Sequence, residues 1–141
     1  MAIYGIGYFN ESSNNVKLEF NPKFKSTSED FKVVEDRLGI KLPTEYKNLC
    51  KKGSFRTYGY EFTCCNPNVG YRYVVDKTLT EREVARADIS KFFVVSDLGI
   101  EGLLLLMDSS GVVYEYSTLS TNPPKKVYNS IKEFIDNIDE E

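Results

Sequence analysis

The first twenty residues alternate between apolar and polar positions in a way that predicts two strands. Residues 3–9 carry Ile, Tyr and Phe among small residues, and residues 16–20 place Val, Leu and Phe at every second position, as a half-buried strand requires. Residues 10–15 between them are rich in Ser and Asn, which is typical of a turn. We therefore expect the two strands to pair as a hairpin.

The next segment has the periodicity of an amphipathic helix. Phe31, Val34 and Leu38 recur at i, i+3 and i+7, a spacing that lines one face of a helix. Ser26 and Glu29 have the spacing of a capping box, which predicts where the helix begins.

A second helix is expected directly after the first. Gly39 is placed to end the first helix in a left-handed conformation, and Pro43 is placed to open the next one. Tyr46 and Cys50 then share one face, and Gly53 ends the helix. The two helices therefore form a pair whose apolar faces need a sheet to cover them.

Residues 54–75 are aromatic and rich in strand-forming types, and the turn-forming segment 66–68 divides them. This pattern predicts a second hairpin. Thr80 and Glu83 have capping-box spacing, which predicts a short charged helix ending near Ala87.

Three further strands and a last helix complete the pattern. Residues 92–95, 103–107 and 112–116 are short apolar or alternating runs, and residues 109–111 form a tight turn between the last two. After Ser130, apolar residues recur at i, i+3, i+4 and i+7, which predicts a C-terminal helix.

The order of these elements predicts an α+β fold. We expect a mostly antiparallel or mixed β-sheet, with the helix pair from the N-terminal half and the C-terminal helix packed on it. A length of 141 residues suits a single domain over residues 1–141, and residues 139–141 are expected to be an acidic tail.

Composition narrows the classes of function. The net charge of −3, from 18 basic and 21 acidic residues, argues against generic binding of nucleic acid. The N-terminus has neither the basic lead nor the apolar segment of a secretory signal, and no apolar run is long enough to cross a membrane. An odd set of cysteines, Cys50, Cys64 and Cys65, suggests reduced thiols in a cytoplasm.

Histidine is absent from the sequence. This removes the usual general base near neutral pH, the usual activator of a Ser or Cys nucleophile and the usual ligand of transition metals. We therefore expect a protein that is not an enzyme and that needs no metal and no cofactor.

Residues 28–55 carry a recognisable motif. A helix with an acidic start is followed by Leu-Gly-Ile-x-Leu-Pro-x-x-Tyr and a second helix, and this order resembles the opening motif of the SUKH superfamily. The residues that match are Leu38, Gly39, Ile40, Leu42, Pro43, Tyr46 and Leu49.

Residues 92–116 resemble a second motif of the same superfamily. In this motif a strand is followed by a Gly-rich turn with an Asp, then by a strand that ends in Asp, and then by Gly-x-Val-Tyr. The matching residues are Asp97, Gly102, Asp108, Gly111, Val113 and Tyr114. The ending NSIKEFID is similar to the closing helix of the family. Residues 1–20 lie outside the strongest match, and we interpret them as a hairpin added to the family fold.

The resemblance implies a function. Bacterial SUKH proteins are typically immunity proteins of polymorphic or contact-dependent toxin systems, which bind a cognate toxin, often a nuclease, and block it inside the cell. Relatives include a fungal regulator of cell-wall synthesis that acts as a signalling scaffold. A cytoplasmic protein that binds another protein is therefore expected, with no direct contact to nucleic acid or membrane.

The Leu-Pro-x-x-Tyr motif is interpreted as structural rather than functional. Gly39 supplies the backbone shape and Pro43 the helix start, and Leu42 can pack against Tyr46 across the bend. The residues with this structural role are Leu38, Gly39, Ile40, Leu42, Pro43 and Tyr46.

Four tyrosines in the predicted second hairpin are candidates for contacting a partner. With a strand period of two, Tyr58 and Tyr60 share one face, and so do Tyr71 and Tyr73. Tyrosine joins a large rigid ring to a polar tip, which suits protein interfaces. Burial of these rings in the core is the alternative.

Asp97, Glu101 and Asp108 form a second candidate set. They could converge on a divalent cation, or they could cap exposed backbone groups of the turns in which they lie. The resemblance adds a third interpretation, in which they face a basic toxin surface and guide its approach.

The sequence thus favours an immunity protein that neutralises a toxin by stoichiometric occlusion, covering the toxin's active site or substrate-binding face. A protein-binding scaffold or regulator unrelated to toxins is the alternative on the same fold. An enzyme that uses carboxylates alone is a third hypothesis.

Overall fold

The computed structural model describes residues 9–12, 15–100 and 102–138. Its helices are α1 (Ser28–Leu38), α2 (Thr44–Lys52), α3 (Val74–Val84) and α4 (Ile131–Asn137), with short 3-10 helices η1 (Pro22–Phe24) and η2 (Pro67–Val69). Its strands are β1 (Phe9–Ser12), β2 (Asn15–Asn21), β3 (Ser54–Thr57), β4 (Tyr60–Glu61), β5 (Phe93–Asp97), β6 (Leu103–Met107), β7 (Val113–Ser117) and β8 (Lys125–Tyr128).

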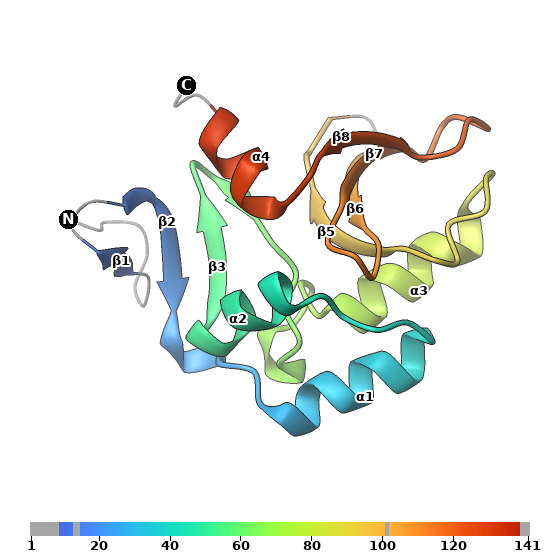
Figure 1. Ribbon diagram of the computed structural model, residues 1–141. Helices are drawn as coiled ribbons and strands as arrows, with labels where there is room; N and C mark the ends of the chain where they lie inside the picture. Colours follow the sequence, from blue (N-terminus) through green and yellow to red (C-terminus); the bar gives the residue numbers. More distant parts are fainter. Residues whose placement is uncertain (1–8, 13–14, 101, 139–141) are drawn as a thin grey trace.

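The strands form two antiparallel sheets, in the orders β1-β2-β3-β4 and β5-β6-β7-β8. The two sheets lie side by side in Figure 1, with α1 below them and α4 near the top of the view. An antiparallel bridge between Phe62 and Ser96 connects them, and the Thr63 amide donates to the Val95 carbonyl (2.9 Å). The predicted α+β class is confirmed, and the division into two sheets was not foreseen from the sequence.

The apolar runs of β5 and β6 are explained by burial on both faces. Phe93, Val95, Leu105 and Met107 point into the main core, which they share with the first sheet and with α1, α2, α3 and α4. Val94, Leu104 and Leu106 point the other way, into a smaller cluster with Ile89 and Tyr116. A strand that is covered on both faces loses the alternation of polar residues.

The helix pair forms where it was predicted, but the first cap differs. The α1 cap is Thr27, whose hydroxyl accepts from the Asp30 amide while the Asp30 carboxylate accepts from the Thr27 amide. The predicted capping box of Ser26 and Glu29 is therefore wrong by one residue. Ser26 is buried and its amide donates to the Cys50 carbonyl (2.9 Å), so it lies outside the helix.

Two glycines end the helices of the pair for different reasons. Gly39 has a φ of 70° and its amide donates to the Glu35 carbonyl, which is the left-handed helix end that was predicted. Gly53 has a φ of 137°, and a Cβ atom there would lie 2.2 Å from the Asn21 carbonyl oxygen. Any side chain at residue 53 would therefore separate the end of α2 from the end of β2.

The second hairpin was predicted to turn at residues 66–68, and this is wrong, because that segment leads into the 3-10 helix η2. Residues 54–61 form the short β3–β4 hairpin, but residues 71–73 precede α3, which begins at Val74. The predicted capping box of Thr80 and Glu83 is wrong, since both residues lie inside α3.

Two further differences concern the ends of the chain. The β1–β2 hairpin is present, with β1 continuing to Ser12 instead of turning after Phe9, and residues 1–8 and 13–14 lie outside the described part. Strand β8 was missed, and its four residues pair with β7. The C-terminal helix is confirmed, and the expected tail at residues 139–141 is not described.

Candidate protein-binding surface

Two of the predicted binding residues, Tyr71 and Asp97, line the same cavity. This cavity has a volume of about 300 Å³, and we call it the Tyr71 pocket. Its lining residues are Glu61, Thr63, Tyr71, Arg72, Lys77, Asp97 and Gly99. They come from β4, the segment before α3, the first turns of α3 and the end of β5, so the pocket forms only when these elements pack together.

Backbone hydrogen bonds hold the segment before α3 against the strands. The Cys64 amide donates to the Arg72 carbonyl (3.0 Å), and the Val74 amide donates to the Cys64 carbonyl (3.0 Å). As a result the Tyr71 hydroxyl reaches β4, where it donates to the Glu61 carboxylate (2.6 Å). The Tyr71 ring is therefore tied to β4 through its hydroxyl and lies near the Arg72 guanidinium, although the residue is 78% exposed.

The charged groups of the Tyr71 pocket form ion pairs. Arg72 Nε lies 3.9 Å from Glu61 Oε1, and Lys77 Nζ lies 3.2 Å from Asp97 Oδ2 and 3.4 Å from Glu81 Oε2. The Arg72 and Lys77 side chains are 12% and 26% exposed, whereas those of Glu61 and Asp97 are 35% and 50% exposed. The cations thus lie deeper than the two pocket-lining carboxylates, which face solvent.

These pairings favour the charged forms of both partners. Burial opposes the ionisation of Asp97, but the hydrogen bond from the Gly99 amide and the neighbouring Lys77 outweigh it and hold the pKa of Asp97 below its ordinary value. Burial also opposes the charge on Lys77, but Asp97 and Glu81 outweigh it and raise the pKa of Lys77. Both groups are therefore ionised at neutral pH.

The other candidate tyrosines do not form the predicted strand faces. Tyr58 has a φ of 47° and lies in the turn between β3 and β4. Tyr60 is half-buried in β4, where its ring meets the edge of Phe134 at 6.2 Å. Tyr73 is 8% exposed and belongs to the core. Only Tyr71 among the four is largely exposed, because the segment before α3 is not a strand.

The candidate carboxylates do not converge. Asp97 ends β5 opposite Leu104, whereas Asp108 follows Met107, which pairs with the start of β5. Asp108 is thus displaced from Asp97 by the length of a strand segment from Leu104 to Asp108, which at the rise of a strand is about 13 Å. Asp108 caps its turn, accepting from the Ser110 and Val112 amides and the Tyr114 hydroxyl, and Glu101 lies outside the described residues.

Among the residues that the structure describes, neither carboxylates nor thiols gather into a metal site. In the described ranges, no group of three or more His, Cys, Asp or Glu side chains is arranged to hold a metal ion. Cys50, Cys64 and Cys65 are free thiols and buried. Burial raises the pKa of Cys64 to about 12, so this thiol stays protonated and unreactive.

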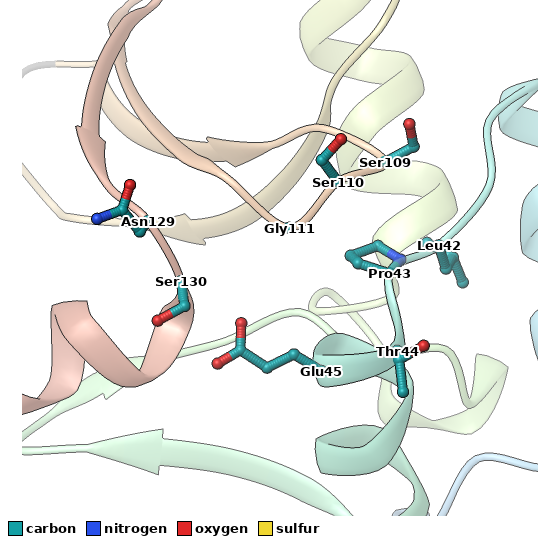
Figure 2. Close-up of a pocket in the computed structure, with 9 residues that line it drawn as sticks. All are labelled: Leu42, Pro43, Thr44, Glu45, Ser109, Ser110, Gly111, Asn129 and Ser130. Carbon is teal, nitrogen blue, oxygen red and sulfur yellow. The ribbon is translucent and has the colours of Figure 1, made fainter.

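A second cavity, of about 510 Å³, lies between α2, the β6–β7 turn and the start of α4. Figure 2 shows its lining, with the Glu45 carboxylate directed toward Ser130. That carboxylate accepts from the Ile131 and Lys132 amides, both at 2.9 Å. We call this cavity the Glu45 cleft, and its acidic group already serves to cap α4.

The residues of the predicted structural motif lie where the helix pair meets the core. Leu38, Leu42 and Tyr46 are buried, Ile40 packs against the core from a half-buried position, and Pro43 precedes the first turn of α2. The Tyr46 hydroxyl is hydrogen-bonded to the Thr63 hydroxyl, 2.8 Å away. These residues therefore join the helix pair to the strands.

Three charged residues of the Tyr71 pocket were not singled out from the sequence as binding residues. Glu61, Arg72 and Lys77 meet only through tertiary packing, and no linear motif joins them. The spacing of Lys77 and Glu81 is the one local signal, since it gives an i, i+4 ion pair once α3 is placed correctly.

The fold is that of a small α+β protein with a preformed charged pocket, and comparison with known proteins places it in a family. The model of the SMI1-KNR4 cell-wall family (SUKH_5) matches residues 8–139, and the chain belongs to this family. The resemblance to the SUKH superfamily is thereby confirmed. The matched range includes β1 and β2.

A solved structure shares the fold. A crystal structure of a protein from Pseudomonas syringae pv. tomato aligns with a TM-score of 0.63 and 18% identity, covering 92% of this chain and 89% of that one. No curated protein matches the chain. Among the helices in the described ranges, none has both the length and the apolar character needed to cross a bilayer.

Proposed function

We propose that this chain is an immunity protein that binds a cognate bacterial toxin in the cytoplasm and neutralises it by stoichiometric occlusion. The observation that carries the proposal is the family match over residues 8–139, because the SUKH resemblance implies toxin immunity. In this proposal the chain is not an enzyme and binds its partner through a surface that exists before contact.

The Tyr71 pocket supports this proposal as one part of the contact surface. Its exposed ring is held in place by Glu61, so little conformational freedom is lost when a partner covers it. Aromatic residues are typical anchors of protein interfaces. The outward carboxylates of Glu61 and Asp97 would favour a partner with a basic surface and speed its approach.

Co-expression tests this function. The chain is produced together with the toxin candidate encoded in the adjacent reading frame, and growth and co-purification are scored. Rescue of growth with a co-purifying complex is the expected result. A partner that co-purifies but is not toxic would favour the scaffold function instead, and a toxic partner that is neither bound nor silenced would contradict the proposal.

Two variants make the co-expression test specific to the surface. Tyr71→Ala removes the exposed ring and should weaken both rescue and co-purification. Leu119→Ala removes another large exposed side chain, 62% accessible against 78% for Tyr71, and should leave both unchanged.

A further inference from the structure

The Tyr71 pocket has an ordered arrangement of charge. Its lining holds two cations, Arg72 and Lys77, and two carboxylates, Glu61 and Asp97, so the lining charges balance, and Lys77 also pairs with Glu81 outside the lining. The most exposed of the five side chains is Asp97, at 50%. A group entering the pocket from solvent therefore meets carboxylate oxygens before it meets either cation.

The exposed carboxylate has acceptor positions to spare. One oxygen of Asp97 accepts from the Gly99 amide (2.9 Å) and the other accepts from Lys77 Nζ (3.2 Å). An ionised carboxylate accepts about four hydrogen bonds, so an incoming donor can bind without displacing Lys77. An acidic group would instead meet like charge at the mouth of the cavity.

The wall of the pocket favours a planar cation over a compact one. Tyr71 presents an exposed ring beside the carboxylates, its hydroxyl is tied to Glu61, and the guanidinium of Arg72 already lies over the ring with Cζ 6.0 Å from its centre. A guanidinium can lie over such a ring and donate to a carboxylate in its own plane, whereas an ammonium is a compact, strongly hydrated charge. The cavity volume of about 300 Å³ is at the lower end of ligand pockets.

From this arrangement we infer that the Tyr71 pocket receives an arginine side chain of the partner protein, bound by Asp97 and covered on one side by the Tyr71 ring. The inference rests on the proposed protein-binding function for the origin of the arginine. The fit of a guanidinium to the pocket depends on the geometry alone, so it can be tested without any toxin.

The test is a titration of the purified full chain with N-acetyl-L-arginine methylamide, followed by amide NMR shifts. Saturable shifts confined to the pocket, at Arg72 and Gly99 among others, are the expected result. N-acetyl-citrulline methylamide has the same shape without the charge and should produce none. Free L-arginine should bind no tighter than the capped form, because the pocket is proposed to bind the side chain of an arginine within a polypeptide.

Two variants complete the titration. Asp97→Asn should weaken binding about tenfold, the size expected for loss of a charged hydrogen-bond partner. Asp88→Asn is the matched control, because Asp88 also accepts from the amide two residues ahead but lies before the other end of β5, and it should bind normally. Equal binding of citrulline, tighter binding of free arginine, or normal binding by Asp97→Asn would overturn the inference. Failure of co-expression rescue with a normal titration would contradict only the toxin-neutralising function.

Discussion

Glu35 shows how one side chain fixes the bend between α1 and α2. Its carboxylate accepts from the Leu42 amide (2.8 Å) and pairs with Lys47 Nζ (3.2 Å), and the side chain is 18% exposed. Burial by itself would raise the pKa of Glu35, but the Leu42 amide and Lys47 outweigh it, so the pKa lies below its ordinary value of 4.5. The ionised form therefore stabilises the folded chain.

Glu35→Gln should lower the free energy of unfolding by about 1 kcal/mol at pH 7. Because the pKa of Glu35 is lower in the folded state, its carboxylate contributes its full stabilisation above the pKa of the unfolded chain. That stabilisation is lost as pH falls through the pKa of the folded chain. Urea denaturation should therefore show a smaller difference in unfolding free energy between wild type and Glu35→Gln at about pH 3.5 than at pH 7.

The exposed pair of Lys32 and Asp36 provides the control for that prediction. Both side chains are 69% exposed, so Asp36→Asn should cost about 0.5 kcal/mol or less. Two results would show that Glu35 does not hold the bend through its charge. One is a loss of unfolding free energy in Glu35→Gln that is the same at both pH values. The other is an equal loss of unfolding free energy in Asp36→Asn.

At the scale of elements, Glu45 links two helices that are far apart in the chain. The residue lies in the first turn of α2, and its carboxylate accepts from two amides at the start of α4. Negative charge at a helix start is favourable, both for the unpaired amides and for the helix dipole. The position of α4 over the strands thus depends on a residue of α2.

Glu45→Ala should lower the stability of the chain by about 1–2 kcal/mol, as loss of a helix cap does. Hydrogen exchange should become faster at Ile131 and Lys132, because their amides lose their acceptor. Glu45→Gln keeps an acceptor oxygen and should show a smaller effect on both measurements. Unchanged exchange at these two amides in Glu45→Ala would contradict this role.

The sequence predicted those elements whose signals are local. The α1–α2 pair follows from apolar spacing, Gly39 and Pro43, and the strands β5, β6 and β7 follow from their apolar runs. Strand β8 was missed because its residues Lys125 and Lys126 are exposed and directly follow two prolines, so no apolar pattern marks it.

The start of helix α3 and the Tyr71 pocket could not be predicted for a different reason. The β-branched pair Val74-Val75 favours a strand by composition, but in the fold both side chains are buried at the start of α3. Farther along, Arg82 donates to the Leu38 carbonyl (3.0 Å), so tertiary contact overrides local preference. Since Tyr71, Lys77 and Asp97 meet only through this packing, the pocket has no linear signature.

At the scale of the whole molecule, the two sheets share one core. Phe62 belongs to the bridge between the sheets, and its ring stacks on Phe55 of β3 (4.8 Å) and meets the edge of Phe134 of α4 (6.0 Å). Residues from both sheets and from helices α1, α2, α3 and α4 are buried together. Such a shared core favours a surface whose shape is set before any partner arrives.

The protein is proposed to act by covering the active surface of its toxin in a complex of one chain with one toxin molecule. The most direct measurement is the residual activity of the purified toxin as this chain is added in increasing molar ratio, at concentrations well above the dissociation constant. Activity should fall in proportion to the amount added and reach its floor at one chain per toxin. Complete loss of activity at a small fraction of one equivalent would reveal catalytic inactivation and contradict the account, as would full activity at excess.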